Sequence, residues 1–221
     1  AAEEYVKDFS FSQQHNMSFS GTAGKTNYYM GLSYMGQGGV VKVNPDSYNR
    51  FSVNYSTDTE IKPWLKVRSK ALYTRTNLET PFNFNTASYD ALYYLYRWPT
   101  IMPYGTYEGE PFRNSVTETA AANMNSDVKD YMRFSVGATF VLGIPDLTLD
   151  VDYTYNLDNQ NITQRGGTVG GWDFWSGSMS LVDNWAATSR NKVDKYQYNR
   201  NYHAGNAVLR YKHTWHDAHS F

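Results

Sequence analysis

Three histidines near the end of the sequence have a spacing that can bind a metal ion when it occurs on a helix. His213, His216 and His219 recur at every third position. On a strand, successive side chains point to opposite faces, so residues three apart do not converge on one ion. The surrounding residues favour the end of a strand and a loop. We therefore interpret these histidines as polar residues and predict no metal site.

Residues 21–26 read GTAGKT and superficially resemble a phosphate-binding P-loop. That motif requires a further glycine five residues before Gly24, and a helix whose N-terminus faces the phosphate. Phe19 occupies the position of the required glycine, and an alternating, strand-like segment follows. We therefore predict no nucleotide site at this turn.

Catalytic residues are not recognisable elsewhere in the sequence. The chain contains no Cys, which removes thiol nucleophiles and thiolate metal ligands. The carboxylates, serines and histidines have no spacing from which a catalytic set can be assembled. We predict no catalytic residues, no cofactor and no enzymatic activity.

The residues best suited to binding are aromatic side chains in two long segments that we predict to be loops. Tyr and Trp combine a large apolar surface with a polar tip, which favours protein interfaces and the flat faces of sugars. The alternative is that these rings pack the loops against one another. The predicted contacts with substrate or with a lid protein are Trp98, Tyr104, Tyr107, Trp172 and Trp175.

Composition excludes several classes of partner and of membrane anchor. The chain has 20 basic and 21 acidic residues, so its net charge of -1 provides no excess of positive charge that would attract nucleic acid. No run of about 18 apolar residues is present, so no transmembrane helix is predicted. The 20 Tyr, 11 Phe and 6 Trp suit a barrel with aromatic girdles, and equally a soluble all-β glycan-binding domain.

The elements that must position the loops are strands, because apolar and polar residues alternate along most of the chain. The alternating segments lie near residues 15–21, 27–35, 48–57, 63–75, 131–142, 147–157, 196–203 and 206–215. Such a strand has one apolar and one polar face. We expect Arg133, Asp150 and Asp152 to face a wet lumen. Facing lipid we expect Phe51, Val53, Tyr55, Phe134, Val136, Phe140, Leu149, Val151 and Tyr153.

The connections between these segments are short and long by turns. Short turns are predicted at Gly24, Lys62, Pro145 and Gly205, with Pro63 at a strand start. Long connections span residues 36–47, 76–130 and 158–195, with a short helix near residues 87–96. An up-and-down barrel places its short turns at one rim and its long loops at the other. We therefore predict an all-β, antiparallel transmembrane β-barrel wall, with roughly eight strands of a larger barrel and long extracellular loops.

Short sequence motifs in these strands resemble those of SusC-like TonB-dependent transporters. Residues 15–21 read HNMSFSG, 25–29 KTNYY, 31–34 GLSY, 37–42 QGGVVK, 48–52 YNRFS and 64–67 WLKV. The corresponding family words are approximately HNLSVSGG, KTxYYxSLGY, QEGIVK, YxRYSxRxN and WLKVG. Gly38 stands where the family usually has Glu, and Met17 where it usually has Leu. Residues 130–135 (DYMRFS) and 144–149 (IPDLTL) resemble later strands of the same barrel.

The resemblance implies TonB-dependent import of glycans or peptides across the bacterial outer membrane. A SusD-like surface lipoprotein would cover the outer mouth, and outer-membrane lipid and lipopolysaccharide would surround the barrel. Residues 1–221 would then be one segment of the barrel domain, with the plug domain, the TonB-contacting segment and the remaining strands outside this chain. Two alternatives stay open, namely a soluble or surface-attached β-sandwich that binds glycans, and a non-energised porin.

Overall fold

The protein is described by a computed structural model that covers residues 5–82, 103–168, 170–174, 177–183, 191–212, 214–215 and 219–220. Seven long strands form one antiparallel sheet in the order β1-β2-β3-β4-β7-β8-β11. Their bounds are β1 (Ser12–Ala23), β2 (Thr26–Gly38), β3 (Ser47–Lys62), β4 (Leu65–Pro81), β7 (Met124–Val141), β8 (Leu147–Arg165) and β11 (Val193–Tyr211). The prediction of an all-β, antiparallel fold is confirmed.

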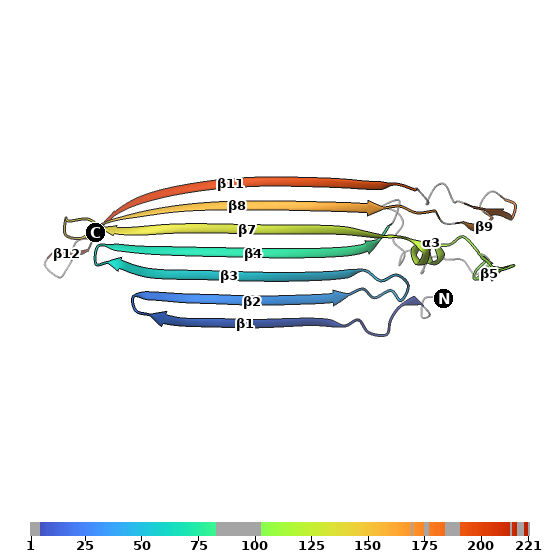
Figure 1. Ribbon diagram of the computed structural model, residues 1–221, viewed down its shortest axis with the longest axis horizontal. Helices are drawn as coiled ribbons and strands as arrows, with labels where there is room; N and C mark the ends of the chain where they lie inside the picture. Colours follow the sequence, from blue (N-terminus) through green and yellow to red (C-terminus); the bar gives the residue numbers. More distant parts are fainter. Residues whose placement is uncertain are drawn as a thin grey trace.

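Smaller elements lie at the two ends of this sheet (Figure 1). The end opposite the short turns carries α3 (Ser115–Ala121) and the short strands β5 (Thr106–Tyr107), β6 (Glu110–Pro111), β9 (Gly171–Asp173) and β10 (Ser180–Val182). At the turn end lie β12 (Thr214–Trp215) and β13 (His219–Ser220). We call these ends the loop end and the turn end.

Three short turns meet at the turn end, as strand parity predicts (Figure 1). Gly24 and Lys25 join β1 to β2, and the positive φ of 60° at Gly24 suits the glycine-rich turns of two-residue hairpins. Residues 142–146 join β7 to β8, as predicted around Pro145, and Asp146 adopts a φ of 65°.

The β3–β4 turn comes directly after the residues predicted for it. β3 continues through Lys62, and the turn consists of Pro63 and Trp64. Pro63 therefore does not start a strand. Its fixed φ and missing N–H suit a turn position. Between Glu60 and Lys62 the pairing of β3 with β4 shifts by one residue, as in a β-bulge.

The predicted hairpin at Gly205 is wrong. β11 runs without interruption from Val193 to Tyr211, and Gly205 pairs directly with Tyr153 in the ladder. Gly205-Asn206 is a dipeptide that favours a two-residue turn, yet here both residues belong to the ladder, with Asn206 paired to Asp152. The two expected strands are thus one, which reduces the predicted eight strands to seven.

The long strands also extend farther into the predicted loops than expected. β4 continues to Pro81 and β7 begins at Met124, so the connection predicted at residues 76–130 is shorter. β8 likewise continues to Arg165, and β11 begins at Val193. Several predictions lie outside the described residues, namely the helix at 87–96, Trp98, Trp175, His213 and His216.

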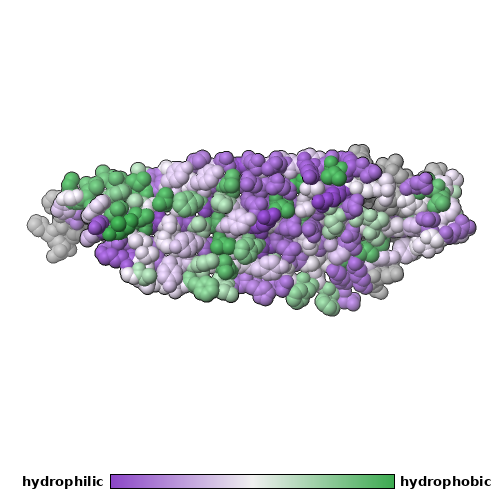
Figure 2. Space-filling model, viewed as in Figure 1, coloured by the Kyte–Doolittle hydropathy of each residue, from purple (hydrophilic) through white to green (hydrophobic). Residues whose placement is uncertain are grey.

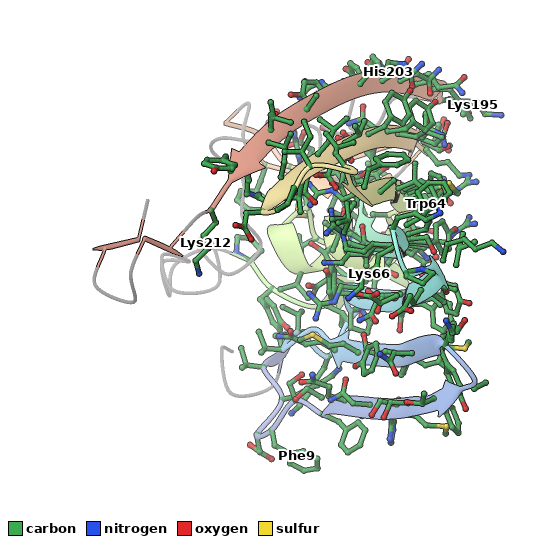
Figure 3. The ribbon with its side chains drawn as sticks, turned by 90° about the vertical axis from the view of Figure 1, so that its left-hand side faces the viewer. Phe9, Trp64, Lys66, Lys195, His203 and Lys212 are labelled. Atoms are coloured by element: carbon green, nitrogen blue, oxygen red, sulfur yellow. The ribbon has the colours of Figure 1, made fainter. Side chains whose placement is uncertain are left out.

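The large sheet is a single layer. Among the described residues, Val116 of α3 is the only buried hydrophobic side chain, and large apolar side chains along the strands are exposed. Seen along the strands from the turn end, Lys66 lies on one side of the sheet and Lys195 and His203 lie on the other (Figure 3). The candidate functional surfaces are therefore the two faces of the sheet and its loop end.

Candidate functional site

Strand register divides the sheet into two chemically different faces. Residues that pair directly across neighbouring strands share a face, and we call such a set a row. One row holds Met30, Tyr55, Ala71, Phe134, Tyr155 and His203. Phe51, Val53, Val136, Phe140, Leu149, Val151 and Tyr153 share this face, whereas Arg133, Asp150 and Asp152 lie on the opposite one. The predicted division is confirmed, and we call the two sides the apolar face and the polar face.

The apolar residues cross their face along a diagonal. In a row near the loop end, β2 and β3 contribute the aromatic rings of Tyr34 and Phe51. The next four strands of this row, β4, β7, β8 and β11, contribute the polar residues Arg75, Asp130, Asn159 and Asn199. In a row near the turn end the distribution is reversed. Here β2 and β3 contribute Thr26 and Thr59, and the next four strands contribute the apolar residues Val67, Ala138, Val151 and Ala207. In Figure 2 the apolar side chains gather at the turn end of the upper strands and farther from it on the lower ones.

The short turns follow the same diagonal. The β1–β2 ladder ends at the pair Ala23–Thr26, in the row that contains Ala138 of β7. The β7–β8 ladder continues three residues beyond that row, to Val141. The β3–β4 ladder ends between these limits, at Lys62 and Leu65. Turns and apolar residues therefore shift together from strand to strand.

The polar face carries a network of ionised groups on β4, β7, β8 and β11. Asp150 is its centre, with 4% of its surface exposed. Arg210 forms an ion pair with one carboxylate oxygen of Asp150, and the Thr139 hydroxyl donates to the other. The Arg68 guanidinium lies 3.7 Å from Asp150 Oδ1 and donates to Asp152 Oδ1 at 3.2 Å. These groups satisfy one another without a covering layer of protein.

Gly137 makes room for part of this network. A Cβ atom at that position would lie 2.1 Å from Asp152 Oδ1 and 3.1 Å from Arg68 Nη2. Any side chain there would displace the ion pair between Arg68 and Asp152. By contrast, the polar face of β1–β3 near Gly31 is lined by uncharged groups, including Asn16, Ser33 and Asn54.

Aromatic side chains from two loops pack together at the loop end. The ring of Tyr107 lies 5.5 Å from that of Trp172, edge to face, and 6.5 Å from that of Phe112. Phe112 also contacts Phe174 at 6.4 Å between ring centres. The indole Nε1 of Trp172 donates to the Tyr107 carbonyl at 2.8 Å. These four residues, Tyr107, Phe112, Trp172 and Phe174, form what we call the aromatic cluster.

An ion pair next to the aromatic cluster joins the same two loops. Arg113 Nη1 lies 2.8 Å from Asp173 Oδ2, and both side chains are largely buried. The Arg113 amide donates to the Trp172 carbonyl at 2.9 Å. Residues 60 positions apart in the sequence are thereby fixed against each other.

The helix α3 is anchored at both of its ends by asparagine side chains. Asn114 is the N-cap, and its Oδ1 accepts a hydrogen bond from the Thr117 amide at 2.9 Å. Asn44, in the β2–β3 loop, donates from Nδ2 to the carbonyls of Thr119 at 3.1 Å and Ala122 at 2.7 Å. A third loop is thus tied to the unit that carries the aromatic cluster.

The structure brings together two of the five predicted contact residues. Tyr107 and Trp172 touch within the aromatic cluster, whereas Tyr104 packs edge to face on Tyr5 at 5.9 Å. Tyr104 and Tyr107 remain 39% and 45% exposed, so both retain surface for a partner. Trp98 and Trp175 lie outside the described residues. Packing within the loops therefore covers part of the surface of each described ring. Contact with substrate or lid stays a prediction.

Several residues that organise the loop end were not found from the sequence. The Asn114 cap has a local signal, because Asn is a preferred N-cap residue and an acidic residue, Glu118, follows it within the first turn. The pairing of Arg113 with Asp173 and the reach of Asn44 to α3 have no local signal, since both join distant segments.

A cavity of about 450 Å³ lies at the loop end, between the β2–β3 loop, the end of β4 and α3. Its volume falls in the range of small-molecule sites. The described residues contain no group of three or more His, Asp or Glu side chains that could bind a metal ion. Nor does that part of the chain contain a helix long and apolar enough to cross a membrane.

Comparisons with known proteins add no relative. No protein-family model matches the chain, and a search of curated proteins gives no significant match. The resemblance to SusC-like transporters therefore stays a prediction.

Proposed function

We propose that this chain forms part of the barrel wall of a SusC-like, TonB-dependent transporter that imports oligosaccharides or peptides across the bacterial outer membrane. One observation carries the proposal. The apolar face crosses the sheet on a diagonal that the short turns follow, while the opposite face is polar and charged. A tilted membrane-spanning sheet requires this arrangement, because the membrane plane cuts tilted strands obliquely.

The length of the apolar run fits the thickness of a membrane. On β8 it extends from Leu147 to Leu157, and every second residue between them is apolar or aromatic. Ten residues span about 34 Å at roughly 3.4 Å each. At a strand tilt of about 40° this length covers about 26 Å of membrane thickness, close to the apolar band of about 25 Å in outer-membrane barrels.

The slope of the diagonal is comparable with the tilt of barrel strands, though smaller. From the β1–β2 turn to the β7–β8 turn, the turn position shifts by three residues over four strands. This shift is about 2.6 Å along the strand for each 4.8 Å across the sheet. That ratio corresponds to an angle of about 28°, somewhat below the 35–45° found in barrels.

The charged network belongs on the opposite, lumen side of the wall. An Arg or Lys on the lipid face costs about 2–4 kcal/mol at the midplane. Arg68, Arg210, Asp150 and Asp152 all lie on the polar face. Their mutual ion pairs suit a wall that faces water or another polar surface.

The alternative of a β-sandwich lacks a second inner face. A sandwich buries the inner sides of two packed sheets. In the described residues the only other sheets are two-stranded hairpins, and no layer covers the apolar face. The membrane-spanning interpretation explains the exposed apolar residues without such a layer.

Cysteine scanning tests the membrane placement, because residues 1–221 contain no Cys. Val136→Cys and Ser135→Cys place a thiol on the apolar and the polar face of adjacent residues in β7. In outer-membrane vesicles, a membrane-impermeant maleimide should label the Ser135→Cys variant and leave the Val136→Cys variant unlabelled until detergent is added. Equal labelling of both variants before detergent would contradict the proposal.

Energised transport separates this proposal from a passive porin. Radiolabelled oligosaccharides and oligopeptides would be offered to cells with and without TonB, at equal levels of the protein in the outer membrane. We expect uptake to require TonB. Uptake that persists unchanged without TonB would favour the non-energised porin.

The loop end is the surface where a SusD-like lid would bind. Trp172→Ala and Tyr104→Ala test the two described contact regions separately, since Trp172 belongs to the aromatic cluster and Tyr104 packs on Tyr5. Co-purification of the lipoprotein with each variant measures the lid contact. Unchanged co-purification and unchanged uptake would restrict both rings to loop packing.

A further inference from the structure

The cavity at the loop end opens on the polar face of the sheet. Gln37, Tyr48 and Thr80 line it from β2, β3 and β4. Gln37 pairs with Tyr48, and Tyr48 with Leu78, in a row that continues to Asp127 on the face of Arg133. The cavity therefore lies on the side that the proposed function assigns to the lumen, beyond the charged network and towards the loops.

The lining of the cavity combines an apolar surface with polar side chains, among them Gln37 and Asn44. Val40, Val41 and Val43 of the β2–β3 loop contribute branched side chains, and Pro81 and Phe82 contribute the opposite wall. Thr119 brings α3 to the same cavity. The three valines, Pro81 and Phe82 together provide an apolar surface that suits an aliphatic side chain.

Among its described residues, the lining contains one carboxylate, that of Asp46. Asp46 lines the cavity and is exposed, and within the described part of the chain its carboxylate forms no ion pair. The Lys7 ammonium donates to the carbonyl of the neighbouring Gly39 at 2.9 Å. Gly39 allows its position, because a Cβ atom there would lie 1.7 Å from Asp46 Oδ1. The Gly39 amide also donates to the Asp46 carbonyl at 2.7 Å, which holds the two residues together.

We infer that this cavity binds the amino-terminal residue of a peptide, with the ammonium group on Asp46 and an aliphatic side chain against Val40, Val41 and Phe82. The inference rests on the proposed function and selects peptides from the two substrate classes that it includes. A charge-assisted hydrogen bond to a carboxylate is roughly twice as strong as a neutral one. The free amino group should therefore determine most of the preference.

Isothermal titration of the full-length protein, extracted with its native partners in mild detergent, tests this assignment. The probes are Leu-Gly-Gly-Gly, its N-acetylated form, Gly-Gly-Gly-Gly and maltotetraose. We expect Leu-Gly-Gly-Gly to bind about tenfold more tightly than the acetylated peptide. Gly-Gly-Gly-Gly should bind more weakly than Leu-Gly-Gly-Gly, and maltotetraose should not compete.

Asp46→Asn should remove the preference for the free amine, and Gly39→Ala should weaken it by displacing the Asp46 carboxylate. Asp58→Asn is the matched control, because Asp58 is an exposed carboxylate of β3 outside the cavity. The inference is wrong if the wild-type protein binds both peptides equally, if Asp46→Asn keeps the preference, or if maltotetraose displaces the peptide.

Fractionation of the same cells separates this inference from the proposed function. The wild-type protein could reside in the outer membrane and require TonB, yet bind the free and the acetylated peptide equally. That result would overturn the peptide site alone. A protein absent from the outer membrane that still prefers the free amine would overturn the transporter and support the peptide site.

Discussion

The turn half and the loop half of the same sheet differ in the chemistry of one face only. Near the turns, β7 presents Phe134 and Val136 on one face and Arg133 and Ser135 on the other. Towards the loops, the face of Phe134 becomes polar, with Asp130 paired across from Arg75. The opposite face stays mostly polar from Thr139 to Asn125, with Val141 at the turn as an apolar exception. The change on a single face marks the height at which the proposed lipid environment ends.

This comparison explains the lengths of the strands. β7 has 18 residues and β8 has 19, whereas a tilted membrane-spanning strand needs about 9–11. The additional residues are those of the loop half, where both faces meet water in the proposed arrangement. In that arrangement they would carry the sheet beyond the membrane, and they lead to the unit formed by α3 and the aromatic cluster.

The largest expected effect comes from a charge placed in the middle of the apolar face. Val136→Arg should destabilise the membrane-inserted protein by about 2–4 kcal/mol, because the guanidinium would face lipid. Ser135→Arg, one residue away on the polar face, is the matched control and should cost little. Urea titration of protein refolded into lipid vesicles measures both values. Similar losses for the two variants would break the distinction between the faces.

The next effect concerns the charged network on the polar face. Asp150→Ala should cost about 1–3 kcal/mol, because it removes the partner of Arg210 and the acceptor of Thr139. The cost stays below that of a fully buried pair, since the Arg210 side chain is 63% exposed and water can solvate it. The same urea titration measures the loss.

Asp152→Ala is the control for that measurement. The Asp152 side chain is 47% exposed, and within the described ranges its one ion pair is with Arg68, so its removal should cost at most about 1 kcal/mol. A larger loss for Asp152→Ala than for Asp150→Ala would mean that exposure does not decide the strength of this network.

Sequence alternation predicted the turn half well and the loop half poorly, for one physical reason. A period of two appears only where the two faces of a strand meet different environments. Phe134 and Arg133 were therefore assigned to the correct faces. The extensions of β4 to Pro81 and of β8 to Arg165 have polar residues on both faces, and they were predicted as loops.

The remaining errors concern information that is not local. Gly205 was predicted as a turn because glycine is common there, yet its pairing with Tyr153 depends on a strand fifty residues earlier in the chain. At the candidate site, aromatic composition identified Tyr107 and Trp172, but their mutual contact and the ion pair of Arg113 with Asp173 required the fold.

A moderate and local effect is expected at the loop end. Asn114→Ala removes the N-cap of α3 and should cost that helix about 1 kcal/mol. Hydrogen exchange of the α3 amides should accelerate, while the amides of β7 within the sheet keep their protection. Asn114→Ser, which retains a capping oxygen, should restore most of the protection. Faster exchange throughout β7 would show that the loop half and the turn half unfold as one unit.

The smallest expected effect sharpens the comparison most. Val128 lies on the same strand and face as Val136, eight residues closer to the loop end, in a row with Asn77 and Asn161. Val128→Arg should therefore change the stability by no more than about 0.5 kcal/mol, as for ordinary surface substitutions. Urea titration of Val136→Arg and Val128→Arg under identical conditions isolates the effect of position along the strand, because both residues lie on the same face of β7. A loss at Val128 as large as that at Val136 would place lipid along the whole strand and would contradict the diagonal boundary on which the proposed membrane position rests.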